Sequence, residues 1–225
     1  MIYHTISGRK FRRRQERILK LNRALKKLFP RAEIALAYKT PWQLLVAVVL
    51  SAQCTDKMVN KITPALFARF PTAAATARAT PRAIERHIRL CGFYRTKAKN
   101  IVAAAHMIQK EFGGRVPRAM EGLLRVPGIA RKSANVILGN AWGVVEGIAV
   151  DTHVRRFALR YDLSDHKDPV KIERDFMRLL PKKEWFPFTY RVIEYGRNIA
   201  PARRYDTSHD PLLKIYPKAA KRFKV

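Results

Sequence analysis

Residues 123–138 have the sequence LLRVPGIARKSANVIL. The Pro127-Gly128 pair is typical of a tight turn, and Ala134, Ile137 and Leu138 after it share one face of a helix. The stretch therefore predicts two helices joined by a short hairpin. Amide N–H groups at the start of the second helix, together with the positive end of its dipole, form a site for a phosphate group. A plain helical turn in a protein core is the alternative, because Pro-Gly turns between helices are common.

Helical periodicity extends over nearly the whole chain, and no segment alternates as a half-buried strand does. Residues 9–29 place Ile18, Leu21 and Leu25 on one stripe, with a basic arm from Arg9 to Arg17 at their start. We expect an all-α fold. Further helices are predicted over 42–50 after Thr40-Pro41, after Thr55 or Asp56, after Thr80-Pro81, from Thr96 to Gly113-Gly114, and near 152–160, 169–180 and 188–199.

The chain of 225 residues carries 46 Lys and Arg against 17 Asp and Glu, a formal charge of +29. Such an excess indicates a polyanionic partner but does not separate an enzyme from a structural DNA-binding protein. The apolar run Leu44–Leu50 is far short of the ~20 residues that cross a bilayer, and the N-terminus lacks a signal segment. We expect a soluble cytoplasmic protein without a membrane partner. Cys54 and Cys91 suggest neither a disulfide framework nor a metal site, and we expect both to be reduced.

Two residues are candidates for chemistry. Lys132 lies in the first turn of the second hairpin helix, where the helix N-terminus and the basic surroundings favour a neutral amine. A neutral lysine amine is a nucleophile that can form a Schiff base, although most exposed lysines are only solvated. Asp151 precedes another expected helix within the sequence VDTHV. Its carboxylate can cap that helix, which is the commoner role for such an aspartate.

Four motifs follow one another along the chain, namely Leu50–Asp56 (LSAQCTD), Gly92–Ala98 (GFYRTKA), Leu124–Val136 with Ile148–Arg156 (IAVDTHVRR), and Tyr195–Arg197 (YGR). In this order they resemble the endonuclease III family of helix-hairpin-helix DNA glycosylases. The resemblance covers roughly residues 17 to 200. It implies two all-α domains, a six-helix barrel over 34–143 and a second domain from 1–33 and 144–225, with a DNA cleft between them.

The resemblance implies a bifunctional DNA glycosylase and AP lyase that acts on oxidised pyrimidines in double-stranded DNA. Lys132 matches the attacking lysine of the family and Asp151 its catalytic aspartate, and the two would face each other across the cleft. Gln53 matches the residue that fills the hole left by the flipped base, and Phe93 matches the wedge on the opposite strand. Without the resemblance, Gln53 would be read as a polar helix-end residue and Phe93 as core. The other expected DNA-binding residues are the hairpin positions Gly128, Ala130, Arg131 and Ser133. At the position of Ala130 the family more often has glycine.

The chain departs from the family at its C-terminus. Many relatives hold a four-iron, four-sulfur cluster on four cysteines with C-x6-C-x2-C-x5-C spacing, and such clusters require thiolate ligands. The matching positions here are Ala200, Thr207, Asp210 and Tyr216, so we expect no iron–sulfur cluster and no other cofactor or metal. Leu212, Leu213, Ile215, Tyr216 and Phe223 are expected to anchor the segment instead, and Arg203, Arg204, Lys214, Lys218, Lys221 and Arg222 to face DNA.

Two other functions stay open on these residues. One is a monofunctional glycosylase directed at mismatched thymine or uracil, which Lys132 disfavours. The other is a DNA-binding protein that kept the fold and lost catalysis, which the combination of Lys132, Asp151 and Gln53 disfavours. We expect a monomer associated with the nucleoid, whose substrate is duplex DNA with a damaged base or an abasic site.

Overall fold

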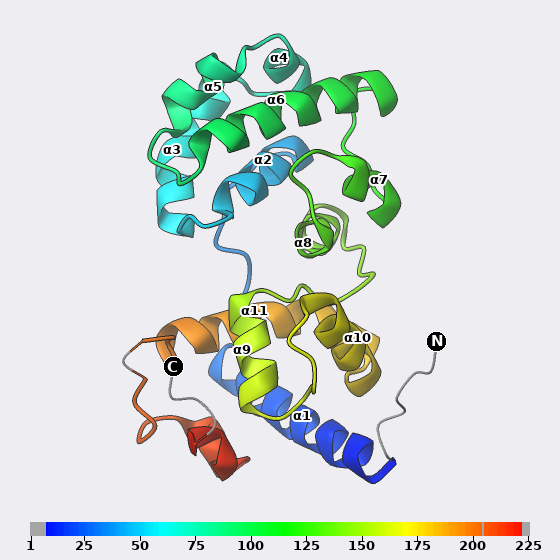
Figure 1. Cartoon of the computed structure of the whole chain (residues 1–225), viewed down its shortest axis with the longest axis vertical. Coiled ribbons are helices and arrows are strands. Elements are labelled where there is room, and N and C mark those ends of the chain that lie inside the picture. Colours follow the sequence, from blue (N-terminus) through cyan, green and yellow to red (C-terminus); the bar gives the residue numbers. More distant parts are fainter. Residues whose placement is uncertain (1–7, 204, 222–225) are drawn as a thin grey trace. The chain divides into compact units, whose positions relative to one another are not determined.

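The computed structural model describes residues 8–203 and 205–221, and that part of the chain contains no strand. The predicted all-α fold is confirmed. Two compact units are present: Ile34–Glu146 forms one, and the described residues on either side of it form the other. The helices are α1 Gly8–Leu28, α2 Pro41–Ser51, α3 Asp56–Arg69, α4 Ala73–Ala77, α5 Pro81–Ile88, α6 Tyr94–Glu111, α7 Met120–Arg125, α8 Arg131–Trp142, α9 Thr152–Arg160, α10 Pro169–Leu179 and α11 Lys182–Asn198, followed by the 3-10 helices η1 Pro211–Lys214 and η2 Pro217–Lys221 (Figure 1).

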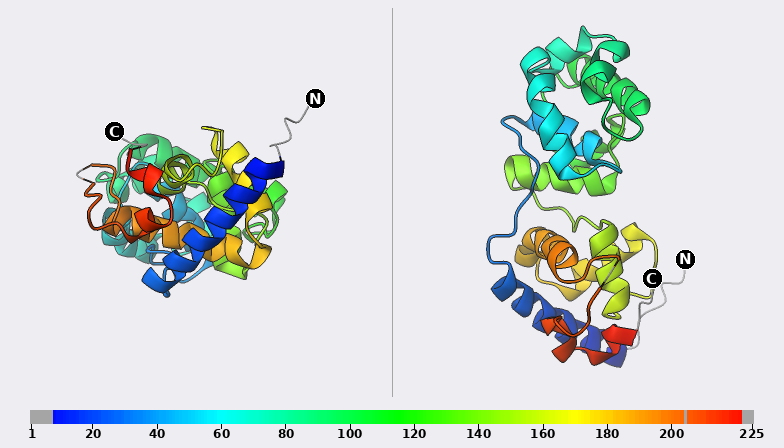
Figure 2. Two further views of the ribbon diagram at one scale, coloured as in Figure 1. Left: turned by 90° about the horizontal axis from the view of Figure 1, so that it is seen from below. Right: turned by 90° about the vertical axis from the view of Figure 1, so that its left-hand side faces the viewer.

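Helix α2 lies at the centre of the Ile34–Glu146 unit and packs against α3, α6 and α8 (Figure 2). Thr40 caps it, with its hydroxyl accepting the Gln43 N–H at 3.2 Å, and Pro41 occupies the first turn as predicted. All residues from Trp42 to Leu50 are buried, which explains why this helix is apolar all round. No helix among the described residues is both long and apolar enough to cross a membrane.

Two features of this unit differ from the sequence-based expectations. Helix α6 begins at Tyr94 and not at Thr96, because the Phe93 carbonyl already accepts the Lys97 N–H at 3.0 Å and no side chain caps the first turn. The alanine-rich residues Ala73–Ala77 form the short helix α4. Hydrophobic periodicity does not predict this helix, because five residues make little more than one turn. Thr72 caps α4 by accepting the Ala75 N–H at 3.1 Å.

The second unit is built from both ends of the chain. Ile18, Leu21 and Leu25 of α1 are fully buried, as predicted, and α1 packs against α10 and α11. Phe176 and Phe188 lie in the same core, where their rings meet edge to face. The sequence predicts that this unit resumes after residue 143. In the structure the division falls after Glu146, in the same loop that follows α8.

The expected basic arm is instead the first part of α1, and much of its charge is used inside this unit. Arg14 is fully buried, donates to the Asp162 carbonyl at 2.9 Å, and pairs with Asp165 at 2.7 Å. Arg17 donates to the Tyr161 carbonyl at 2.8 Å. Hydrogen bonds from Arg14 hold the pKa of the Asp165 carboxyl well below its usual range. Arg14 and Arg17 therefore hold the loop after α9, while the neighbouring Arg12 and Arg13 remain exposed.

Candidate functional site

The predicted hairpin is formed by α7 and α8. Val126 ends α7 and its carbonyl accepts the Ile129 N–H at 3.1 Å, which closes a tight turn around Gly128. Val126 and Ile129 are buried and fix the turn to the unit, whereas Gly128 is exposed. Gly128 has φ +85, a left-handed conformation that glycine adopts at little cost.

The first turn of α8 has the properties of an anion site. Ala130 is the N-cap residue, so no side chain accepts the first amide groups of the helix, and no acidic residue lies in the first turn. Ala130 has φ −103, an extended conformation that any residue adopts, so the alanine is compatible with the hairpin. Arg131, Lys132 and Ser133 follow directly and are half-buried. The helix dipole, the amides and the Arg131 guanidinium together favour a negative group here.

Gly128 also approaches α6. A Cβ atom at this position would lie 3.3 Å from the Asn100 side chain. We expect Gly128→Ala to cost about 1–2 kcal/mol through the left-handed backbone and to weaken binding of duplex DNA, because the turn must shift away from Asn100. Urea unfolding and fluorescence anisotropy measure the two effects.

Gly113 provides the matched control. It also has a left-handed backbone, with φ +58, but a Cβ there would meet nothing within 4 Å. Gly113→Ala should lose similar stability and keep DNA affinity. Equal loss of affinity in both variants would show that the Gly128 turn has no special part in binding.

Two exposed turns of the same unit lie side by side. Gln53 follows α2 and Phe93 precedes α6, and both have a left-handed backbone, with φ 52 and 56. A Cβ at Gly92 would lie 3.3 Å from the Gln53 carbonyl, so the backbones of the turns nearly touch. Phe93 is 65% exposed and is therefore not a core residue. Strained backbone and an exposed ring are typical of a contact surface.

Lys97 of α6 was not among the predicted site residues. Its side chain is buried and its Nζ donates to the Leu50 carbonyl at 2.8 Å. Burial lowers the pKa of this lysine. The helical register indicates its inward position, because Lys97 precedes Ile101 by four residues on the apolar stripe of α6.

The two candidate catalytic residues start consecutive helices. Lys132 belongs to the Ile34–Glu146 unit, and Asp151 to the unit built from both ends of the chain. Asp151 caps α9, since its Oδ1 accepts the Val154 N–H at 2.8 Å, as the sequence predicted. His153 packs against α11, where a Cβ at Gly196 would lie only 2.3 Å from its Nδ1. Glycine at position 196 is thus needed for this contact.

The C-terminal segment is held by a buried carboxylate. Asp210 is 5% exposed and accepts hydrogen bonds from the hydroxyls of Tyr161, Tyr195 and Tyr205. Its other oxygen accepts the Leu212 N–H at 2.9 Å and so caps η1. We call Asp210 and the three tyrosines the Asp210 cluster. Burial raises the pKa of all three phenols, that of Tyr205 to about 12.

The expected apolar anchors accompany this cluster. Leu212 is fully buried, and Leu213, Ile215 and Tyr216 pack partly buried against the same core, as predicted. The expected basic residues Arg203, Lys214, Lys218 and Lys221 are exposed. Phe223, Arg204 and Arg222 lie outside the described residues.

The donor set of this segment does not fit an iron–sulfur cluster. Of the four matching positions, Ala200 has no donor atom and Asp210 is committed to the tyrosines and to η1. Both cysteines of the chain, Cys54 and Cys91, belong to the other unit. Within the described residues, no group of three or more His, Cys, Asp or Glu could hold a metal ion.

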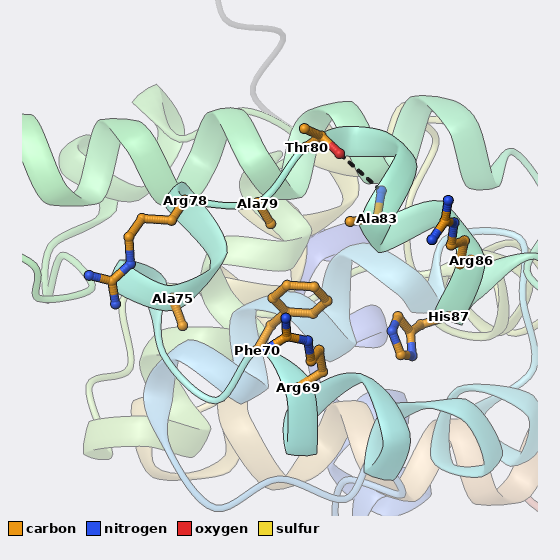
Figure 3. A pocket seen from close by; sticks show the side chains of 9 residues that line it. All are labelled: Arg69, Phe70, Ala75, Arg78, Ala79, Thr80, Ala83, Arg86 and His87. Carbon is orange, nitrogen blue, oxygen red and sulfur yellow. Dashed lines mark hydrogen bonds between the residues drawn. The ribbon is translucent and has the colours of Figure 1, made fainter.

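A separate basic pocket lies between α3, α4 and α5. Its volume is about 580 Å³. Phe70 and three alanines line it, and Figure 3 shows Arg69, Arg78 and Arg86 around it. None of the predicted site residues lines this pocket.

Comparison with known proteins agrees with the hairpin and with the fold. Residues 46–182 match the HhH-GPD superfamily of base excision DNA repair proteins. An endonuclease III of Synechocystis sp. is 47% identical over 211 residues, which cover 94% of this chain and 96% of that protein. The chain belongs to the endonuclease III family. A Bacillus subtilis endonuclease III is 39% identical over 198 residues, covering 88% of this chain and 90% of the relative. The family predicted from the four motifs is confirmed.

Solved structures of the endonuclease III family show the same fold. A trapped covalent intermediate of an endonuclease III with DNA matches with a TM-score of 0.88 and 37% identity, over 92% of this chain and 98% of that one. A thermostable thymine-DNA glycosylase matches with a TM-score of 0.78 but only 18% identity, which shows the fold alone.

Proposed function

We propose that this member of the endonuclease III family is a bifunctional DNA glycosylase and AP lyase of base excision repair. It removes oxidised pyrimidines from duplex DNA and cleaves the resulting abasic site. The observation that carries this function is Lys132 in the uncapped first turn of α8, directly after a hairpin shaped to hold a phosphate. A relative of 37% identity has been trapped as a covalent intermediate with DNA, which fits an amine nucleophile at this position.

In this mechanism the damaged nucleotide leaves the stack, which costs least at a lesion. The Lys132 amine forms a bond to C1′ of the deoxyribose while the bond from C1′ to the base breaks. Asp151 accepts the proton of the amine or stabilises the positive charge that develops on the sugar. The departing base takes up a proton. The bond from C1′ to the ring oxygen then breaks, which opens the sugar and leaves an imine between Lys132 and C1′. This imine makes the C2′ proton acidic, and β-elimination expels the 3′ phosphate and cuts the strand.

The other predicted residues bind and deform the duplex. Gly128, Ala130, Arg131 and Ser133 hold a backbone phosphate at the hairpin, a contact without base information. Gln53 fills the hole left by the flipped base, and Phe93 separates base steps on the opposite strand. The exposure and the fixed left-handed backbone of both turns support this role.

A panel of duplexes tests the proposal. Duplexes with thymine glycol, with an abasic site or with a G·T mismatch are incubated with the full chain and then treated with borohydride. We expect a trapped adduct and strand cleavage on the first two. Base release from the G·T duplex without an adduct would favour the monofunctional alternative, and binding without any reaction would favour the non-catalytic one.

We further propose that the protein works without an iron–sulfur cluster or another cofactor, as a monomer in the cytoplasm that associates with the nucleoid. The Asp210 cluster supports the first point, because Asp210 is at one of the four positions that match the ligand cysteines and its carboxylate is committed to three tyrosine hydroxyls. We expect the iron content and the acid-labile sulfide content of the purified protein to be far below one equivalent per chain. Stoichiometric iron would overturn this proposal, and light scattering tests the monomer.

A further inference from the structure

The two cysteines of the chain lie together. Cys54 and Cys91 are the only cysteines in the sequence, and their Sγ atoms are 3.3 Å apart. Both are free thiols. Cys54 lies between α2 and α3, next to Gln53, and Cys91 lies between α5 and α6, two residues before Phe93. The mechanism above uses neither thiol, so the pair is available for other chemistry.

The surroundings give the two thiols different roles. Cys91 is 2% exposed, whereas Cys54 is half-buried and open to solvent on one side. Burial and the hydrogen bond with Cys54 raise the pKa of the Cys91 thiol to about 12, while the charge of Lys97 acts in the opposite direction. A small oxidant from solvent therefore meets Cys54 first, with Cys91 within reach behind it.

We propose that Cys54 and Cys91 are a peroxide-reactive thiol pair that closes to a disulfide between the two turns. The Cys54 thiolate attacks one oxygen of hydrogen peroxide, the O–O bond breaks, and the leaving hydroxide takes up a proton to become water. The Cys91 sulfur then attacks the Cys54 sulfenic acid, the S–O bond breaks, and a second water leaves. Two thiols are oxidised to one disulfide, and one peroxide is reduced to two waters.

Closure changes the geometry of the adjacent turns. A disulfide bond is about 2.05 Å long, so the two sulfurs must approach by roughly 1.2 Å from their present 3.3 Å. The backbones of the two turns are already close together, since a Cβ at Gly92 would lie 3.3 Å from the Gln53 carbonyl. A change in the distance between the two sulfurs therefore acts on both turns. Gln53 and Phe93 therefore shift. This consequence rests on the proposed function, in which both residues contact the lesion, and a shift of about 1 Å in a positioned group can cost up to ~10²-fold in rate.

The thiol chemistry is tested without an activity assay. The full chain is treated with a small excess of hydrogen peroxide, quenched with catalase and analysed by intact mass and maleimide labelling. We expect a loss of two hydrogens, no reactive thiol, a peptide that joins Cys54 to Cys91, and full reversal by dithiothreitol. The Cys91→Ala variant should instead gain oxygen at Cys54, and Cys54→Ser should change little. Two thiols that remain reactive, or a disulfide-linked dimer, would overturn the proposal.

A second measurement tests the consequence. Excision of thymine glycol by the oxidised protein should fall at least about tenfold and recover after reduction, while Cys54→Ser should excise equally well before and after peroxide. A disulfide that forms without any change in excision would overturn the shift of Gln53 and Phe93. If the protein forms the disulfide with peroxide but excises no base in its reduced state, the proposed function is overturned and the proposal of a reactive thiol pair stands.

Discussion

Lys132→Gln is expected to abolish the borohydride-trapped adduct on both thymine glycol and abasic duplexes. Glutamine keeps much of the length and polarity of lysine but has no amine that can form an imine. Strand cleavage should fall by roughly 10³-fold or more, the scale seen when a covalent nucleophile is removed. Binding of duplex DNA should change little, because Lys132 is one of 46 basic residues. Trapping gels and anisotropy measure the two effects.

Lys99→Gln is the matched control, since Lys99 is an exposed lysine on α6 of the same unit. It removes the same charge and should leave trapping intact. Lys97→Gln would be a poor control, because the Lys97 Nζ donates to the Leu50 carbonyl inside the core. An adduct that persists in Lys132→Gln and disappears after another lysine is replaced would reassign the nucleophile.

Asp210→Ala is expected to destabilise the unit built from both ends of the chain by about 3–5 kcal/mol, the scale for removing one partner of a buried charged network. Three tyrosine hydroxyls and the Leu212 N–H lose the Asp210 carboxylate at once, and the hydrogen bond between the Tyr161 and Tyr195 hydroxyls can satisfy only one of these donors. Buried donors without a partner are costly. Asp210→Asn keeps one acceptor oxygen and should lose less. Urea unfolding monitored by tyrosine and tryptophan fluorescence measures the change.

Asp206→Ala provides the comparison, because Asp206 lies in the same segment but is exposed, and its carboxylate bonds to its neighbours Ser208 and His209. Its unfolding midpoint should stay close to that of the parent.

The Asp210 cluster also predicts alkaline sensitivity. A phenol with its pKa raised from about 10 to about 12, as in Tyr205, stabilises the fold fully below pH 10 and loses this effect as pH rises through 12. A parent protein equally stable at both pH values would contradict this.

Much of the fold could be predicted because local signals agree with tertiary packing. Thr40, Thr55 and Thr80 cap helices where the sequence places them, and the hairpin forms around Pro127-Gly128. These features depend on neighbours within a few residues, which a sequence displays directly. The family motifs then located the candidate residues.

The features that escaped prediction depend on distant partners. Arg14 contacts Asp162 and Asp165, which are 148 and 151 residues away, so a pattern of charges along α1 cannot reveal that this arginine is buried. The start of α6 differs because Phe93 takes a left-handed backbone, which residue type alone does not indicate for phenylalanine. The Asp210 cluster joins three tyrosines from separate segments, and only the fold brings them together.

The location of α1 also constrains the order of events during synthesis. The Ile34–Glu146 unit is one continuous stretch, so it can fold as soon as it leaves the ribosome. Helix α1 is made before this unit, but its residues Ile18, Leu21 and Leu25 are buried in a core to which α10 and α11 contribute, and these helices are made more than 140 residues later. Helix α1 therefore waits in the nascent chain with an apolar stripe uncovered until α10 and α11 have been made.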